Sequence, residues 1–145
     1  MKVRLLLAHS AEVQSNLLYA MGIGWTRIGP GPSPFAIAAL IEVLWDETNR
    51  PYRVAFDIVD VDGQPFQVPT PTGDRPFHIT AEFRQGRPPD AAPGTAFLAA
   101  IAVNVQPVQF QPGRQYLVRA LVDDTVMDQT GFRVRIEPPP PPQRG

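Results

Sequence analysis

The sequence contains no cysteine among its 145 residues. This absence excludes a disulfide framework, a thiol nucleophile, an iron–sulfur cluster and any zinc site built on cysteine ligands. Histidine is scarce as well, with only His9 and His78, and a zinc site needs at least three converging ligands. Glu12 lies near His9, but no set of three ligands at suitable spacing is present, so we expect no metal and no cofactor.

Charge of one sign is not in excess, because 13 basic residues face 14 acidic ones and the net charge is −1. This balance argues against nucleic acid or an anionic membrane as a partner. Long apolar runs are also lacking. The first one, Leu5–Ala8, is interrupted by His9 and Glu12, whereas a signal peptide needs roughly 7–15 apolar residues and a membrane span about 20. We therefore expect a cytoplasmic protein.

Catalytic patterns are missing too. The three serines are Ser10, Ser15 and Ser33, and none of them sits in a Gly-x-Ser-x-Gly elbow. The glycines form no phosphate-binding loop between a strand and a helix. An unrecognised pair of carboxylates is the remaining enzymatic alternative, since such partners meet only in the folded chain. We expect a protein that is not an enzyme.

Three aspartates, Asp57, Asp60 and Asp62, precede Gly63 and raise the question of a calcium loop. With Gly63 at the sixth position of an EF-hand register, the first and twelfth ligands would be Ile58 and Pro69. Neither side chain binds calcium. The pair Asp62–Gly63 instead predicts a tight turn between two strands.

What the chain does have is proline, 18 residues, and glycine, 11 residues, which together exclude a helical bundle. Apolar and polar side chains alternate with a period of two between the turns, the pattern of half-buried strands. The expected strands are Val3–Ala8, Leu17–Arg27, Phe35–Trp45, Tyr52–Ile58, Phe66–Val68, Phe77–Phe83, Thr95–Val105, Tyr116–Val122 and Phe132–Ile136.

Eight or nine antiparallel strands of this kind predict an all-β fold, an immunoglobulin-like or related Greek-key β-sandwich. The segment from Pro112 to Tyr116 resembles the corner of such domains, where a tyrosine hydroxyl bonds back to the chain. The segment 35–45 also fits a short helix, but the period of its large residues favours a strand. We expect one domain over residues 1–137 and a disordered or polyproline tail over 138–145.

Two of the predicted strands carry mainly small apolar residues on the face that should meet water. In 35–45 the even positions include Ala36, Ala38 and Leu40, and in 95–105 they include Leu98, Ala100 and Ala102. An antiparallel sandwich strand normally carries polar side chains there, so something must cover these two faces. We predict that these six residues bind a partner, most simply a second copy in a homo-oligomer. The alternative is that the chain covers itself, for example with residues 13–18.

The expected function is therefore a non-enzymatic structural or interaction protein that self-associates. The alternative is a small ligand-binding module that takes a carbohydrate or a peptide on loops at one end of the sandwich. Tyr19, Trp25, Trp45 and Tyr52 are candidates for a platform that stacks on sugars. Both tryptophans also fit the core, because each continues the large-residue face of its segment.

The order of the motifs resembles a family of short, uncharacterised actinobacterial proteins. The resemblance covers residues 2–136 and rests on the N-terminal strand from Lys2 to Ala8, Leu18–Trp25, Gly31–Pro34, Ile41–Trp45, Asp62–Gly63, Gly86–Pro89 and the Pro112–Tyr116 corner. These are turn and core residues, so the resemblance implies an intracellular bacterial protein and transfers no catalytic or binding residue.

Overall fold

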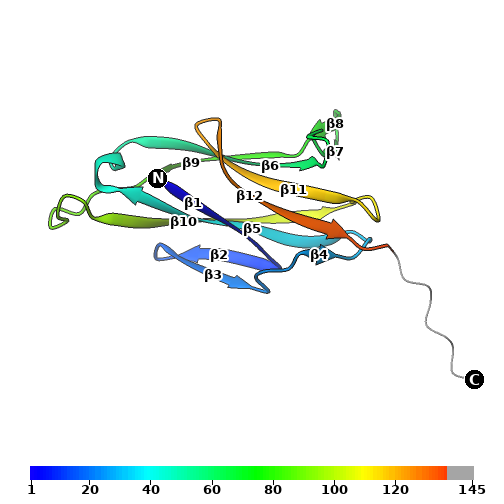
Figure 1. The fold of residues 1–145 in the computed structure, drawn as a ribbon, viewed down its shortest axis with the longest axis horizontal. Helices are drawn as coiled ribbons and strands as arrows, with labels where there is room; N and C mark the ends of the chain where they lie inside the picture. The colour runs from blue at the N-terminus through cyan, green and yellow to red at the C-terminus, as the bar shows by residue number, and fades with distance from the viewer. Residues whose placement is uncertain (137–145) are drawn as a thin grey trace, which may run out of the picture.

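The computed structural model describes residues 1–136, and this part of the chain is all-β with two sheets packed face to face. Figure 1 shows the layers, and the expected tail at 138–145 lies outside the described residues. The elements are β1 (Lys2–Ala8), β2 (Ser10–Gln14), β3 (Leu17–Met21), β4 (Arg27–Ile28), β5 (Ser33–Leu44), the 3-10 turn η1 (Trp45–Glu47), β6 (Pro51–Asp60), β7 (Gln67–Thr70), β8 (Gly73–Pro76), β9 (His78–Arg84), β10 (Ala96–Val108), β11 (Gln115–Val122) and β12 (Thr125–Val134).

The main sheets have the strand orders β1-β5-β10 and β4-β12-β11-β6-β9. Neighbouring strands are antiparallel except β4, which runs parallel to the end of β12. Two separate hairpins, β2-β3 and β7-β8, complete the architecture. The β-sandwich is therefore confirmed, although the described residues form twelve strands where the sequence pattern predicted eight or nine.

The segment 35–45 is a strand, as its period of two predicted, and the helix alternative is wrong. The prediction of one strand over 17–27 is also wrong. The chain leaves β3 after Met21 and turns through Gly22 and Gly24, whose φ angles are 72° and 92°. A positive φ interrupts a strand, and glycine adopts it without steric cost.

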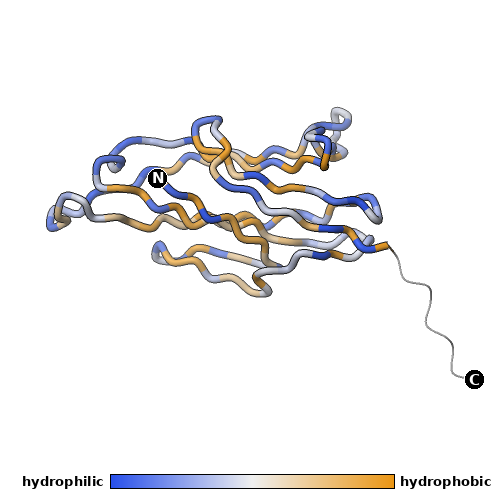
Figure 2. Tube along the Cα trace, in the orientation of Figure 1, coloured by the Kyte–Doolittle hydropathy of each residue, from blue (hydrophilic) through white to orange (hydrophobic). Residues whose placement is uncertain are grey.

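The core lies between the two main sheets, where large side chains from both inner faces interdigitate. Figure 2 shows the apolar residues concentrated along the strands of this sandwich and the hydrophilic ones at its turns. Aromatic rings fill one end of the core. Trp25 packs edge-on against Phe35 and Phe132, with ring centroids 5.8 and 5.4 Å apart. Such edge-to-face pairs add roughly 0.5–1.5 kcal/mol beyond the burial of apolar area.

Tyr116 forms the expected corner. It is buried at the start of β11, and its hydroxyl accepts a hydrogen bond of 3.2 Å from the backbone N–H of Gln111. The ring also stacks on Phe132, with centroids 5.6 Å apart. The residue thus joins the loop that follows β10 to the packed core.

Replacing Tyr116 by phenylalanine keeps the ring and removes only the acceptor for the Gln111 N–H. We expect this change to lower the free energy of unfolding by about 1 kcal/mol, the usual cost of one such hydrogen bond. Urea denaturation measures it. The control is Thr125→Val on the exposed start of β12, where the loss of a hydroxyl should change stability by less than about 0.5 kcal/mol. Equal stabilities of the two variants would contradict the role of the corner.

Candidate interaction surface

The outer face of the β1-β5-β10 sheet carries all six residues that the sequence predicted to bind a partner. Register places them in rows across the sheet, with Arg4, Leu40 and Ala100 in one row and Leu6, Ala38 and Ala102 in the next. The structure divides these rows into a covered half and an open half. The open half is the end of the sheet nearest Leu98.

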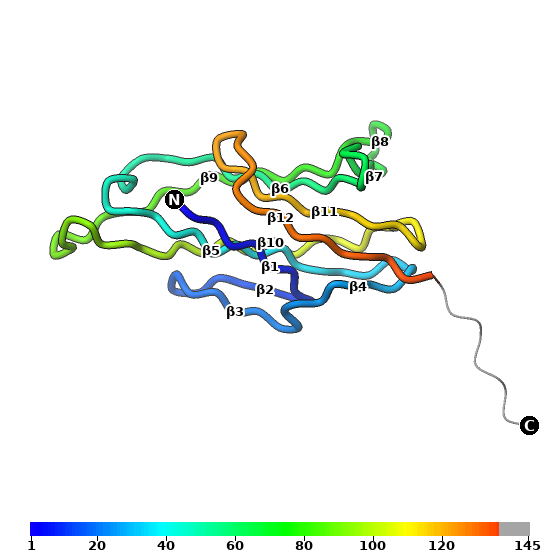
Figure 3. Tube along the Cα trace, viewed as in Figure 1, coloured from blue at the N-terminus to red at the C-terminus, as the bar shows by residue number. Residues whose placement is uncertain are grey.

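The covered half lies under the β2-β3 hairpin, which forms a third layer on this face (Figure 3). Ala36 and Ala38 are fully buried by it, and Ala102 is half-buried. The prediction that Ala36 and Ala38 contact a partner is therefore corrected. The chain covers them itself, as the alternative stated, because the small side chains let the hairpin backbone come close.

The hairpin is held by its own turn and by one side chain of the sheet. Ser15 and Asn16 have φ angles of 50° and 62°, the double positive φ of a tight two-residue hairpin turn. From β10, the Asn104 side chain donates to the carbonyl of Ala11 at 2.7 Å and accepts from its N–H at 3.1 Å. This paired contact uses both groups of the amide, so it sets the position of β2 over the sheet.

The face of the hairpin that points away from the sandwich differs between its two strands. On β2 it carries the polar residues Ser10, Glu12 and Gln14, which pair in register with Met21, Tyr19 and Leu17 of β3. The three β3 side chains are 73%, 51% and 59% exposed. Strand β3 therefore presents an apolar stripe to solvent, and its far edge has no neighbouring strand within the described residues.

The open half of the sheet is mixed in character. Leu98 is 65% exposed, whereas Leu40 and Ala100 are half-buried. A hollow of about 550 Å³ lies beside them and includes Lys2, Arg4 and Glu42 among its walls. Lys2 and Glu42 are cross-strand neighbours of opposite charge. Leu40, Leu98 and Ala100 thus stay accessible at one end of the predicted face.

The aromatic platform proposed for sugars is not assembled. Tyr52 is buried in the core. Trp25 packs against the core at Phe35, whereas Tyr19 lies on the exterior of the hairpin. The guanidinium of Arg87 covers the Trp45 ring at 3.6 Å and also donates to the Trp45 carbonyl at 2.7 Å. The four rings therefore offer no common surface.

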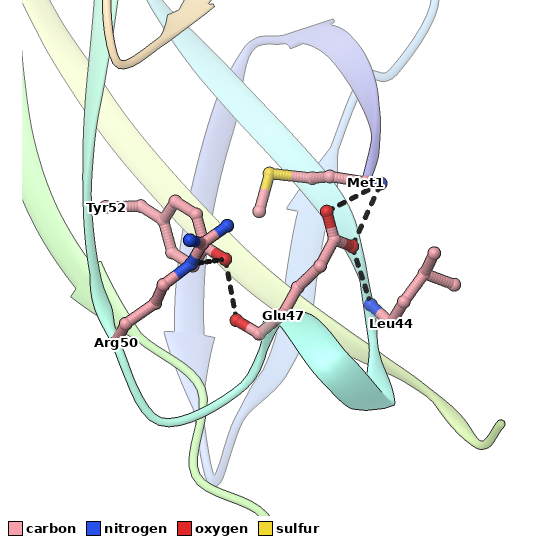
Figure 4. Close-up of polar contacts among 5 residues, drawn as sticks. All are labelled: Met1, Leu44, Glu47, Arg50 and Tyr52. Atoms are coloured by element: carbon pink, nitrogen blue, oxygen red, sulfur yellow. Dashed lines mark hydrogen bonds and ion pairs between the residues drawn. The ribbon is translucent and has the colours of Figure 1, made fainter. Parts of the chain in front are cut away.

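Around η1 the polar side chains form a structural cluster (Figure 4). The Glu47 carboxylate accepts from the backbone N–H of Leu44 at 2.9 Å and forms an ion pair with the Met1 ammonium, also at 2.9 Å. The Tyr52 hydroxyl donates to the Glu47 carbonyl at 2.6 Å and accepts from Arg50 at the same distance. The Leu44 hydrogen bond is the main cause that lowers the pKa of Glu47. This cluster fixes the start of β1 to the end of β5.

On the outer face of the second sheet, Arg119 and Asp57 form a bidentate pair with distances of 2.6 and 2.7 Å. This hydrogen bonding is the main cause that raises the pKa of Arg119. Each oxygen of Asp57 accepts from the guanidinium, so the carboxylate is occupied by a structural partner. Among residues 1–136, no group of three or more histidines, aspartates or glutamates is arranged to hold a metal ion.

The fold and this surface define an all-β sandwich with a hairpin as its third layer. The chain belongs to DUF6941, a family of unknown function, whose model matches residues 4–135. This match confirms the expected likeness to uncharacterised proteins. None of the curated proteins and none of the solved structures compared with the chain matches it. No helix in the described part of the chain has the length and apolar character to cross a membrane.

The β2-β3 hairpin was not predicted from the sequence, although the sequence contains a signal for it. Ser15–Asn16 is a turn dipeptide between two five-residue segments, and asparagine tolerates a positive φ better than most residues. The apolar residues that follow Asn16 instead suggested one continuous strand. Asn104 gave no local signal, since its partner Ala11 lies 93 positions away.

Replacing Asn104 by alanine removes both hydrogen bonds to Ala11, and we expect the hairpin to open more often. The amide protons of β2 and β3 should then exchange about five-fold faster or more, since losing these two hydrogen bonds costs roughly 1–3 kcal/mol. Hydrogen exchange followed by mass spectrometry measures this. Gln106→Ala on the same strand is the control and should leave exchange in the hairpin unchanged. Unchanged exchange in Asn104→Ala would show that apolar packing alone holds the hairpin.

Replacing Glu47 by glutamine should destabilise the protein by about 1 kcal/mol at pH 7. The pKa of Glu47 is lower in the folded state than its ordinary 4.5, so its carboxylate stabilises the fold above that pH. The contribution is lost as the pH falls through 4.5 and then through the lower folded pKa. Urea denaturation at pH 7 and about pH 3 tests this, because the gap between wild type and variant should close in acid.

Glu82→Gln on the exposed face of β9 is the matched control for this experiment. It should change stability by less than about 0.5 kcal/mol at either pH. A gap between wild type and Glu47→Gln that stays constant with pH would contradict an electrostatic role for Glu47.

Proposed function

We propose that this is a non-enzymatic interaction protein whose subunits associate through the free edge and apolar stripe of β3. The observation that carries the proposal is the clustering of exposed large apolar side chains on this one segment. Besides the stripe of Leu17, Tyr19 and Met21, Ile23 in the following turn is 53% exposed. Contiguous apolar surface of this kind marks interaction sites in soluble proteins.

A second copy of the chain fits this surface because the stripe is complementary to itself. If two β3 strands pair antiparallel about a two-fold axis at Tyr19, Leu17 of one copy lies opposite Met21 of the other. The two Tyr19 rings then meet at the axis, and the polar row of β2 stays outside on both copies. A two-fold contact requires such a self-complementary patch. Pairing also satisfies the free backbone groups of the β3 edge.

Pairing would also support the hairpin itself. A two-stranded sheet is only marginally stable in water, and within one subunit β2-β3 gains its support from the sheet beneath it. Joining two hairpins at β3 makes a four-stranded layer across both subunits. Each subunit would then contribute the same edge, and the assembly would close as a dimer.

The immunoglobulin-like character of the sandwich is part of the same proposal. The chain passes from β5 to β6 and β9 in the opposite sheet, returns to β10 beside β5, and then crosses again to β11 and β12. The orders β1-β5-β10 and β12-β11-β6-β9 thus correspond to A-B-E and G-F-C-C′ of immunoglobulin-like domains. The Tyr116 corner at the start of β11 supports the same correspondence.

Light scattering of the purified protein at tens of micromolar tests the proposal, with a mass of two subunits expected for wild type. Tyr19→Arg places a charge at the centre of the contact and should give a folded single subunit, with an unchanged circular dichroism spectrum. Val61→Arg is the matched control, since Val61 is 67% exposed and lies outside the hairpin. It should leave the dimer intact.

Two results would overturn the proposal. One is a wild type that is already monomeric under these conditions. The other is a dimer that survives Tyr19→Arg but dissociates in Leu98→Arg, because the contact would then lie on the open half of the sheet. The Leu98 side chain is 65% exposed, so its replacement is not expected to unfold the protein.

A further inference from the structure

The two long sides of the sandwich are closed differently. On one side β1 lies against β12, and the backbone N–H of Leu5 donates to the Asp128 carboxylate at 2.8 Å. On the other side β9 and β10 are the last strands of their sheets and are not paired with each other. A groove of about 600 Å³ opens on this side. Its size is within the range of small-molecule sites, about 300–1,000 Å³.

The bottom of the groove is part of the hydrophobic core. Phe77 and Val105 are buried core residues that line it. Phe66 lies beside them, with its ring centroid 4.7 Å from that of Phe110 and 5.4 Å from that of Tyr116. These packed rings hold the groove in shape without a ligand. The apolar walls are completed by Val68 of β7 and Val108 of β10.

The lining also defines which ligand the groove accepts. No residue that the structure places in its wall carries a charge, and the polar members are the amides Gln67, Asn104, Gln106 and Gln109. Asn104 is already paired with Ala11, and the Gln109 amide nitrogen donates to the Pro30 carbonyl, so Gln67, Gln106 and the side-chain carbonyl of Gln109 are left for a ligand. A charged ligand would lose hydration here without gaining a counter-charge. Three further members are proline, which has no N–H and cannot pair with an added peptide strand.

We propose that this groove binds an uncharged, mainly apolar small molecule, whose polar end reaches the amide side chains at the rim. The aromatic floor buries the apolar body of the ligand. An amide both donates and accepts hydrogen bonds, so the rim suits neutral groups such as a hydroxyl or a carbonyl. This site is separate from the β3 surface and does not depend on self-association.

Two fluorescent probes that share one ring system test the proposal. N-phenyl-1-naphthylamine is neutral, and 8-anilino-1-naphthalenesulfonate carries an added sulfonate. We expect the neutral probe to bind saturably with one probe per chain, and the charged probe to bind at least ten-fold more weakly. Val108→Arg and, on the opposite wall, Val68→Arg should each weaken the neutral probe at least ten-fold.

Val126→Arg and Tyr19→Arg are the controls. The first introduces the same charge on an exposed part of β12, and the second alters the β3 stripe, so neither should change the affinity of the neutral probe. Val68 lies on the separate β7-β8 hairpin, which keeps the experiment interpretable if Val108→Arg fails to fold.

Equal binding of both probes, or neutral binding unaffected by Val68→Arg, would overturn the proposal. A change of subunit number in Val68→Arg without a change in probe affinity would show that the groove is a contact between copies, and would overturn it as well. Loss of probe binding in Tyr19→Arg alone would move the binding to the β3 stripe.

Discussion

The close approach of the β2-β3 hairpin to the alanines of β5 is the contact on which the arrangement of the outer surface depends. Ala36 and Ala38 have no side chain beyond the β-carbon, so a second backbone lies directly over the sheet. Apolar area at these positions is thereby removed from water by the chain itself. The Asn104–Ala11 pair then fixes which residues of β2 lie inward, and this choice determines which face of β3 looks outward.

The polar clusters support this arrangement at its edges. Met1 and Glu47 bind the first strand to the end of β5, and Leu5 with Asp128 binds the same strand to the opposite sheet. An unpaired strand edge invites association, and a hydrogen-bonded carboxylate protects it. The β9-β10 side has no such contact in the described chain, which is why its core residues reach the surface in the groove. Of the prolines that line the groove, Pro107 belongs to β10 and removes one backbone N–H from that open edge.

Much of the sandwich follows from local pattern, and the hairpin does not. The period of two in 52–58 and 116–122 reports burial on one face of a strand, and both segments are central strands of the second sheet. The Tyr116 corner could be predicted because Tyr116 and its hydrogen-bond partner Gln111 lie only five positions apart in the sequence. The position of the hairpin instead depends on Asn104 and Ala11, which are distant in the sequence. Strand β7 overlaps the short strand predicted at Phe66–Val68, whereas β8 was not predicted because prolines at 71 and 76 obscure its alternation.

An apolar outer face shows that a sheet is covered, and the connectivity decides what covers it. Strand β1 ends at Ala8, which pairs with Ala36 at the edge of the alanine patch, so the chain emerges beside the surface that needs a cover. Only one residue separates β1 from β2, so placing the β2-β3 hairpin on this surface costs little chain entropy. The hairpin therefore covers the alanines in preference to a second molecule. The stripe on β3 is likewise an exposed apolar surface, and it lies on the outer face of the hairpin layer. No segment of residues 1–136 lies over it, so a matching edge from another copy is the simplest way to remove it from water.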